Sequence, residues 1–209
     1  MTRSPLAMQR LALACAALGG ILVAGCAAPA GPAALAEPAP GRGPTAVARL
    51  LDTQGRPMGG ASFTPAGSGV EVMVEVTGVS PGLHGFHVHE NGVCGPGPDA
   101  ATGQQIAFGA AGGHFDPGQA RSHGKPGQAP HQAHAGELPN IEARADGTGT
   151  LRYLSPWLTA EQGKPNSVVG RSLVVHEKAD DYQGQPAGNS GGRILCGVIV
   201  PAEARPPRG

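Results

Sequence analysis

The chain has 209 residues, which is enough for one domain with a hydrophobic core. It contains 35 glycines and 21 prolines but only 3% aromatic residues, and no long segment keeps the apolar period of a helix. These two features favour short strands joined by turns and long loops. The formal net charge is zero and no run of either sign occurs, which argues against a nucleic-acid or polyanion partner.

Residues 1–26 have the pattern of a secretory signal peptide. Arg3 and Arg10 supply its positive charge, and the apolar stretch 11–23 is too short to span a bilayer comfortably. The segment ends in the letters LVAGC, which resemble a bacterial lipobox, so Cys26 is the predicted lipidated residue. The alternative is an ordinary signal peptide that happens to contain a cysteine.

Residues 27–44 are almost entirely alanine, proline and glycine, and we expect them to form a flexible tether. Residues 45–201 are the predicted folded domain, and the proline-rich residues 202–209 are a predicted disordered tail. This organisation predicts an exported protein of the bacterial envelope, in the periplasm or at the cell surface, held to a membrane by a lipid at Cys26 alone.

Alternating apolar side chains predict a series of short strands after the tether. The clearest is 69–77, which has valine at positions 70, 72, 74 and 76. Asp146-Gly147 predicts a hairpin turn. Eight strands indicate an all-β fold, an antiparallel sandwich or barrel. The predicted strands are 47–51, 60–64, 69–77, 83–90, 141–145, 149–154, 168–176 and 193–200.

The predicted strand 83–90 carries two histidines, His87 and His89, two positions apart. Such side chains leave a strand on the same face, about 6.6 Å apart along it, so both rings can converge on one metal ion. The alternative is a histidine pair on a solvated strand face. Between the fourth and fifth strands, residues 91–139 are unusually long for a loop, but they contain four histidines through which a metal could order them. Histidine and carboxylate ligands suit copper and zinc.

Two cysteines, Cys94 and Cys196, remain in the predicted domain, because Cys15 leaves with the signal peptide and Cys26 is the predicted lipid anchor. In an oxidising compartment they predict one disulfide. Closing a loop of about 100 residues stabilises a fold by about 4.7 kcal/mol in the chain-entropy model. The alternative is two free buried thiols.

Five separated motifs stand out in the domain: GFHVHE at 85–90, GGHFDP at 112–117, HAGELPN at 134–140, GRSLVVHEKADD at 170–181 and RILCGVI at 193–199. In these motifs the domain resembles the bacterial copper, zinc superoxide dismutases. The resemblance implies an eight-stranded Greek-key barrel with long metal-binding loops. It also implies dismutation of superoxide to dioxygen and hydrogen peroxide by alternate reduction and oxidation of one copper, with one zinc per subunit.

The resemblance further implies a role for each matching residue. Arg193 matches the arginine that draws the superoxide anion beside copper, and Asp180 matches the carboxylate that hydrogen-bonds one ligand of each metal. His114 matches the histidine that bridges both metals and can supply a proton, and Cys94 and Cys196 match the family disulfide. The implied copper ligands are His87, His89, His114 and His176, and the implied zinc ligands are His114, His123, His134 and Glu137.

Some residues depart from the family or have no counterpart in it. Glu137 stands where the family has aspartate, which keeps a copper-only dismutase open as an alternative. The loop 182–192 carries no charge and lacks the acidic and basic residues that guide substrate in eukaryotic relatives. We expect His84 to be structural, and His131 to be either solvated or a competitor for zinc. The relatives differ in oligomeric state, so the expected state is either a homodimer or a monomer.

Two further readings compete with the enzyme. A non-enzymatic copper- or zinc-binding protein would need the histidines but neither Arg193 nor Asp180. A purely structural sandwich would explain none of the histidines.

Overall fold

Eight antiparallel strands close into a barrel in the computed structural model, which describes residues 45–99 and 102–202. The predicted signal peptide, Cys26 and the tether lie outside the described residues, as does the predicted tail beyond residue 202. Within the described part of the chain, no helix is long and apolar enough to cross a membrane. The predicted all-β class and its eight strands are confirmed.

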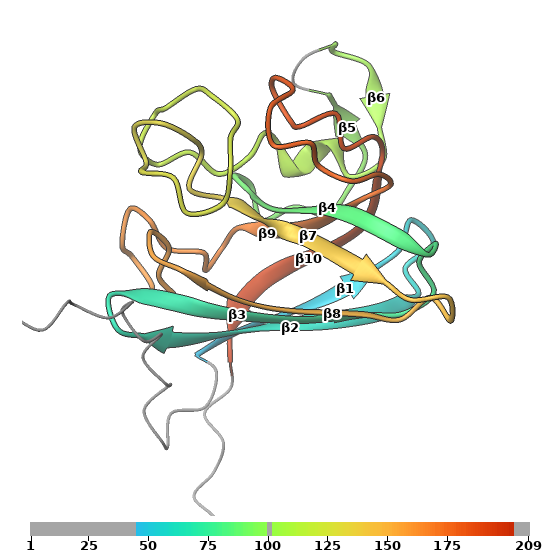
Figure 1. Ribbon diagram of the computed structural model, residues 1–209, viewed down its shortest axis with the longest axis horizontal. Coiled ribbons are helices and arrows are strands. Elements are labelled where there is room, and N and C mark those ends of the chain that lie inside the picture. The colour runs from blue at the N-terminus through green and yellow to red at the C-terminus, as the bar shows by residue number, and fades with distance from the viewer. Residues whose placement is uncertain (1–44, 100–101, 203–209) are drawn as a thin grey trace, which may run out of the picture. The chain divides into compact units, whose positions relative to one another are not determined.

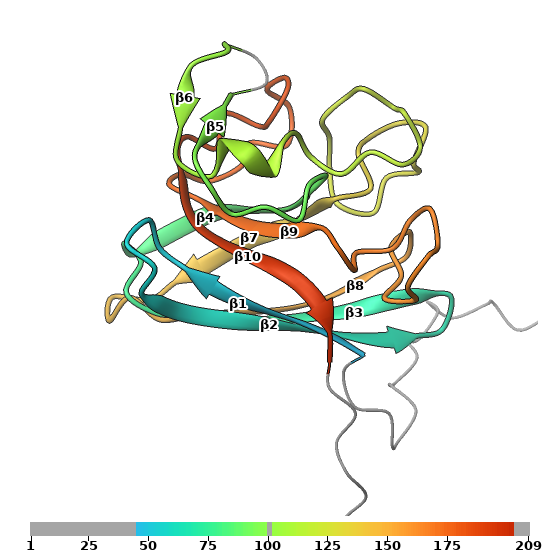
Figure 2. The same cartoon turned by 180° about the vertical axis from the view of Figure 1, so that it is seen from behind.

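The strand order around the barrel is β1-β10-β9-β4-β7-β8-β3-β2, so crossovers join β3 to β4 and β8 to β9 across the barrel (Figures 1 and 2). Every strand pair is antiparallel. The strands are β1 (Ala46–Leu51), β2 (Pro57–Ala66), β3 (Gly69–Val76), β4 (Gly82–His89), β7 (Glu137–Ala143), β8 (Gly149–Ser155), β9 (Ser172–His176) and β10 (Arg193–Pro201).

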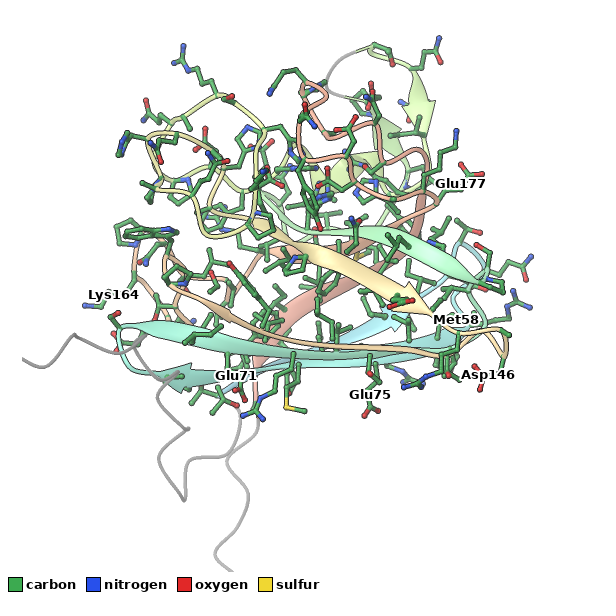
Figure 3. The ribbon with its side chains drawn as sticks, in the orientation of Figure 1. Met58, Glu71, Glu75, Asp146, Lys164 and Glu177 are labelled. Atoms are coloured by element: carbon green, nitrogen blue, oxygen red, sulfur yellow. A yellow bond between two sulfur atoms is a disulfide. The ribbon has the colours of Figure 1, made fainter. Side chains whose placement is uncertain are left out.

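Strand β3 shows how the sequence separates the core of the barrel from its surface. Its valines at 70, 72, 74 and 76 are buried in the core with Phe63, Phe86 and Leu138. Glu71 and Glu75 lie between the valines and project away from the barrel (Figure 3). Because side chains alternate along a strand, one face of β3 fills the core while the other meets solvent.

Three strands have boundaries that differ from the predicted ones by more than one residue. Strand β2 is longer at both ends than the predicted 60–64. Strand β7 begins at Glu137 rather than 141, because Glu137 pairs in register with His87 on β4. Strand β9 begins only at Ser172, because Gly170 has a φ of +82° and interrupts the extended backbone before it.

The segment between β4 and β7 is ordered by local structure rather than left as one long loop. It contains the two-stranded hairpin of β5 (Gly97–Pro98) and β6 (Gln105–Ile106) and the 3-10 turn η1 (Gly109–Ala111). In Figures 1 and 2 this segment and the loop between β9 and β10 lie on the same side of the barrel, beyond β4. These two loops bring together the side chains of the site.

Candidate metal centre

Strand β4 buries both histidines of its motif. His87 and His89 are fully buried, which rules out the solvated strand face, and their ring centroids are 6.2 Å apart. His84 has the predicted structural role: its Nδ1 lies 2.7 Å from the carbonyl oxygen of His176 and its Nε2 lies 2.8 Å from that of Ser80. The side chains of His87 and His89 therefore both point into the same interior space.

Four histidines from three parts of the chain meet at that point. The ligand atoms of His87, His89, His114 and His176 all lie within 4.8 Å of one another. Among the described side chains, five buried nitrogen and oxygen atoms have no hydrogen-bond partner, and four belong to this cluster. They are Nδ1 of His87 and Nε2 of His89, His114 and His176.

The other nitrogen of each ring in this cluster is held by a hydrogen bond. His87 Nε2 lies 2.8 Å from Asp180, His89 Nδ1 lies 3.0 Å from the carbonyl oxygen of Gly112, and His114 Nδ1 lies 3.1 Å from Glu137. Such partners fix the ring orientation and tautomer of a metal ligand. The remaining nitrogens are left as lone-pair donors with nothing else to bind, and this donor set fits copper.

Three rings of this cluster, those of His89, His114 and His176, are neutral and ready to bind a metal at neutral pH. Burial and neighbouring imidazoles hold the pKa values of His89 and His176 well below 6.5. Burial and the adjacent His87 lower the pKa of His114 to about 4. Each of these three rings can therefore coordinate one metal ion through its unpartnered Nε2 without losing a proton. A second metal ion on Nδ1 of His114 would have to displace the hydrogen that this atom shares with Glu137.

A second cluster shares His114 and surrounds a buried carboxylate. Glu137 Oε1 lies 3.1 Å from Nδ1 of His114, 2.8 Å from Nδ1 of His123 and 2.7 Å from Nδ1 of His134. Burial would raise the pKa of Glu137, but the three imidazoles lower it far below its usual range. Three imidazoles and one carboxylate are a donor set typical of zinc, and the longer glutamate side chain reaches all three rings.

Asp180 joins the two clusters. Its Oδ2 lies 2.8 Å from Nε2 of His87, and its Oδ1 lies 2.8 Å from Nε2 of His123. Its side chain is completely buried, yet hydrogen bonds from these two rings hold the pKa of its carboxyl well below the usual range. One carboxylate therefore fixes a ring in each cluster.

Zinc binding is expected to expel a proton from His123. Burial alone would lower the pKa of His123, but hydrogen bonds to Asp180 and Glu137 raise it to about 9 in the metal-free protein. The ring is therefore protonated below about pH 9, and a zinc ion bound at Nδ1 would have to displace that proton. We expect the zinc affinity to rise by up to about tenfold per pH unit up to about pH 9 and then to level off. Chelator competition across this pH range measures the effect, and an affinity independent of pH below 9 would contradict it.

Gly188 is required where the loop before β10 crosses Asp180. Its φ is +65°, and a Cβ there would overlap Asp180 Oδ1 and lie 2.6 Å from His123 Nε2. We expect Gly188→Ala to break the bond between these two side chains and lower zinc affinity by about 10–100-fold. Gly170→Ala is the matched control, because Gly170 has a similar φ of +82° but no atom within 4 Å of its missing Cβ. Equal zinc affinity of the two variants, measured by competition with a chelator, would refute this account of Gly188.

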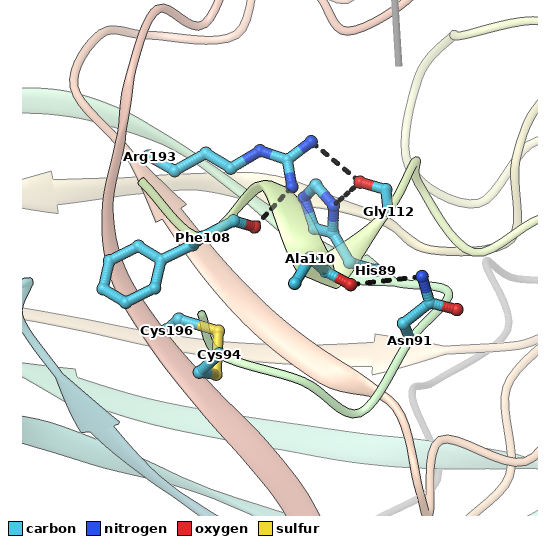
Figure 4. Close-up of a disulfide and its surroundings, with 8 residues drawn as sticks. All are labelled: His89, Asn91, Cys94, Phe108, Ala110, Gly112, Arg193 and Cys196. Atoms are coloured by element: carbon cyan, nitrogen blue, oxygen red, sulfur yellow. Dashed lines mark hydrogen bonds between the residues drawn. A yellow bond between two sulfur atoms is a disulfide. The ribbon is translucent and has the colours of Figure 1, made fainter. Parts of the chain in front are cut away.

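Arg193 lies beside the four-histidine cluster and is held by two backbone carbonyls. Its Nη1 donates to Phe108 at 2.9 Å and its Nη2 donates to Gly112 at 2.7 Å. The carbonyl of Gly112 also accepts the hydrogen bond from His89, so Arg193 and His89 are held by the same carbonyl oxygen (Figure 4). Burial lowers the pKa of Arg193, but an arginine stays charged at neutral pH.

A disulfide ties down the segment that supplies these carbonyls. Cys94 and Cys196 are bonded across 102 residues of sequence, which excludes the two free thiols. Both cysteines pack with Ala111 and Phe108 in a small second core, and Figure 4 shows the disulfide beside Phe108. The disulfide therefore stabilises both the barrel and the turn that orients Arg193.

Several contacts of the site could not be found from the sequence. The carbonyls of Phe108 and Gly112 are backbone groups. Two further partners lie in the loop 182–192, in which the sequence shows only a lack of charge: the side-chain amide of Gln185 hydrogen-bonds the backbone of His123, and the hydroxyl of Ser190 lies 3.1 Å from Nδ1 of His176. His131 is exposed, and the described contacts place it in neither cluster. Its HxxH spacing to His134 was the signal that suggested a competing ligand.

The fold and the two linked clusters define the class, a β-barrel protein with two candidate metal sites that share one histidine. The chain belongs to the copper/zinc superoxide dismutase family, because residues 58–199 match that family. It is 51% identical over 156 residues to the superoxide dismutase [Cu-Zn] of Deinococcus radiodurans, covering 75% of this chain and 84% of that protein. It is 37% identical over 147 residues to that of Brucella abortus, covering 69% of this chain and 80% of that protein.

Solved structures agree with this relationship. The Cu/Zn superoxide dismutase from Brucella abortus superposes with a TM-score of 0.63 at 34% identity, covering 73% of this chain and 97% of that one. A SOD-like protein from Bacillus subtilis gives a TM-score of 0.60 at 31% identity, covering 72% and 95%. The chain is therefore a superoxide dismutase, which converts superoxide to dioxygen and hydrogen peroxide with copper and zinc as cofactors.

Proposed function

We propose that the four-histidine cluster holds the copper of this enzyme and that the cluster around Glu137 holds its zinc. The observation that carries the first assignment is the set of four buried, unpartnered nitrogens directed into one space. When bound there, copper supplies the electron exchange, taking an electron from one superoxide and giving it to another. The copper ligands are then His87, His89, His114 and His176, and the zinc ligands are His114, His123, His134 and Glu137.

Arg193 is the residue that binds and orients the substrate. Its guanidinium carries a fixed positive charge and two-pronged donor geometry beside the cluster, which suits a small anion. Arg193 and His114 both line a pocket of about 250 Å³. Three carboxylate residues, Glu90, Asp99 and Asp116, also line it, and the loop 182–192 adds no positive charge. Attraction of the anion at this mouth therefore depends on Arg193 and the bound metal.

His114 is the candidate proton donor for peroxide formation. Its Nδ1 faces Glu137 in the zinc cluster, while its Nε2 faces the copper cluster without a partner. When Nε2 is not bound to copper, it can hold a proton and deliver it to the substrate as peroxide forms, while Nδ1 keeps the ring in place. A cation on Nδ1 lowers the proton affinity of the ring, which favours that delivery.

Metal analysis of the purified protein separates this assignment from its alternatives. The proposal predicts one copper and one zinc per chain, with zinc lost in Glu137→Ala while the barrel stays folded. One copper and no zinc in the wild type would favour a copper-only dismutase. Full occupancy by both metals without superoxide consumption would favour the non-enzymatic metal-binding protein.

We also propose that the protein is exported and anchored through a lipid on Cys26, with residues 27–44 as a tether, as a monomer or homodimer. The signal-peptide pattern supports export, and the disulfide suits an oxidising compartment. Fractionation of cells that produce Cys26→Ser tests the anchor: the variant should leave the membrane fraction. An ordinary signal peptide would instead leave both forms soluble.

A further inference from the structure

A buried serine holds the outer nitrogen of one candidate copper ligand. Ser190, in the loop before β10, is 2% exposed, and its Oγ lies 3.1 Å from Nδ1 of His176. The carbonyl oxygen of Gly191 also faces that nitrogen but is more distant, at 3.4 Å. The serine hydroxyl therefore makes the closer of the two contacts.

The second partner of this hydroxyl fixes the direction of the hydrogen bond. Ser190 Oγ donates its hydrogen to the carbonyl oxygen of Ala187 at 2.8 Å. A hydroxyl has one hydrogen to donate, so toward His176 the oxygen can only accept. Nδ1 of His176 then carries the ring hydrogen, and Nε2, the buried atom without a partner, presents its lone pair to the cluster.

The position of the hydroxyl is fixed by the backbone around it. The carbonyl oxygen of Ser190 accepts the amide of Lys178 at 2.9 Å, and Lys178 lies only two residues after His176. The carbonyl of Lys178 in turn accepts the amide of Gly85 on β4 at 2.7 Å. Backbone hydrogen bonds thus hold Ser190 to the strands that carry the four-histidine cluster.

We propose that Ser190 is a positioning residue for copper, whose hydroxyl fixes the tautomer and ring orientation of His176. Hydrogen bonding to the outer N–H of a ligating imidazole raises its basicity, so the hydroxyl strengthens Nε2 as a donor to Cu(II) more than to Cu(I). This inference rests on the proposed assignment of His176 as a copper ligand. It gives the uncharged loop 182–192 a function in the copper site that does not require charge.

The test compares the Cu(II) and Cu(I) affinities of the zinc-loaded protein by chelator competition. Ser190→Ala is expected to weaken Cu(II) binding about tenfold relative to Cu(I). For one electron, this change raises the reduction potential by about 59 mV. In the Cu(I) form, the ¹H–¹⁵N signal of His176 Nδ1–H should exchange with water faster in the variant than in the wild type.

Two further variants keep the outcomes distinct. Ser167→Ala removes another buried serine, whose hydroxyl accepts the amide of Val169 at 3.2 Å, and should leave the reduction potential unchanged. An unchanged potential in Ser190→Ala, or an equal shift in both serine variants, would overturn the role of Ser190. His176→Ala should lose copper altogether, and full Cu(II) affinity in that variant would overturn the ligand assignment itself.

Discussion

Replacement of Arg193 by alanine is expected to lower kcat/KM for superoxide by about ten- to a hundredfold, while both metals stay bound. The reason is that electrostatic guidance raises the association rate of a charged substrate by about that factor. The guanidinium is the only cationic side chain that lines the pocket beside His114 in the described structure. It donates hydrogen bonds to the carbonyls of Phe108 and Gly112 rather than to a histidine ring. Removing it takes away the anion-binding charge and leaves the ligand atoms in place.

Two controls accompany the measurement of kcat/KM in Arg193→Ala. Arg193→Lys keeps the charge but loses the planar pair of donors, so its rate should be intermediate. Arg152→Ala removes an arginine that pairs with Glu71 on the outside of the barrel, and it should leave the rate unchanged. An unaltered rate in fully metallated Arg193→Ala would show that the arginine does not bind the substrate.

The second large effect is expected from Asp180→Asn, which should weaken zinc binding by about 10–100-fold and weaken copper binding as well. The carboxylate accepts hydrogen bonds from both His87 and His123, whereas a carboxamide can accept from only one of them. The amide nitrogen then donates to Nε2 of the other ring, so the hydrogen of that ring has to move to Nδ1. In each ring, Nδ1 is the atom that faces the proposed metal.

Asp181→Asn is the matched control for this substitution. Asp181 is the next residue and is exposed, and its carboxylate accepts the amides of Gln183 and Gly184 rather than an imidazole. Zinc affinity is measured by chelator competition for both variants. If Asp180→Asn binds zinc as tightly as Asp181→Asn, the carboxylate does not orient the ligands.

The sequence was sufficient to predict that the eight strands exist, because signals such as the alternation of valine in 70–76 and the turn at Asp146-Gly147 are local. It could not place the start of β7, because Glu137 is extended only through its pairing with His87 on a distant strand. Register of this kind depends on partners far apart in the chain, which no local pattern contains.

The candidate ligands were identified by motif, whereas their supporting contacts were not. His87 and His89 share a face by simple strand geometry, so their convergence could be predicted. The partners Gly112, Gln185 and Ser190 act through a carbonyl, a loop amide and a hydroxyl, whose positions depend on the folded loops. Glu137 lies between these cases: its type suggested a ligand, and only the folded structure shows its carboxylate within 3.1 Å of three imidazoles.

The central claim is that superoxide is consumed at the four-histidine cluster, and a copper titration of zinc-loaded protein tests it most directly. The rate of superoxide disappearance, followed as copper is added, should rise linearly and reach a plateau at one copper per chain. The same titration of His89→Ala should give no comparable rise. A wild-type protein that binds one copper and one zinc yet leaves superoxide at its spontaneous rate of decay would contradict the claim.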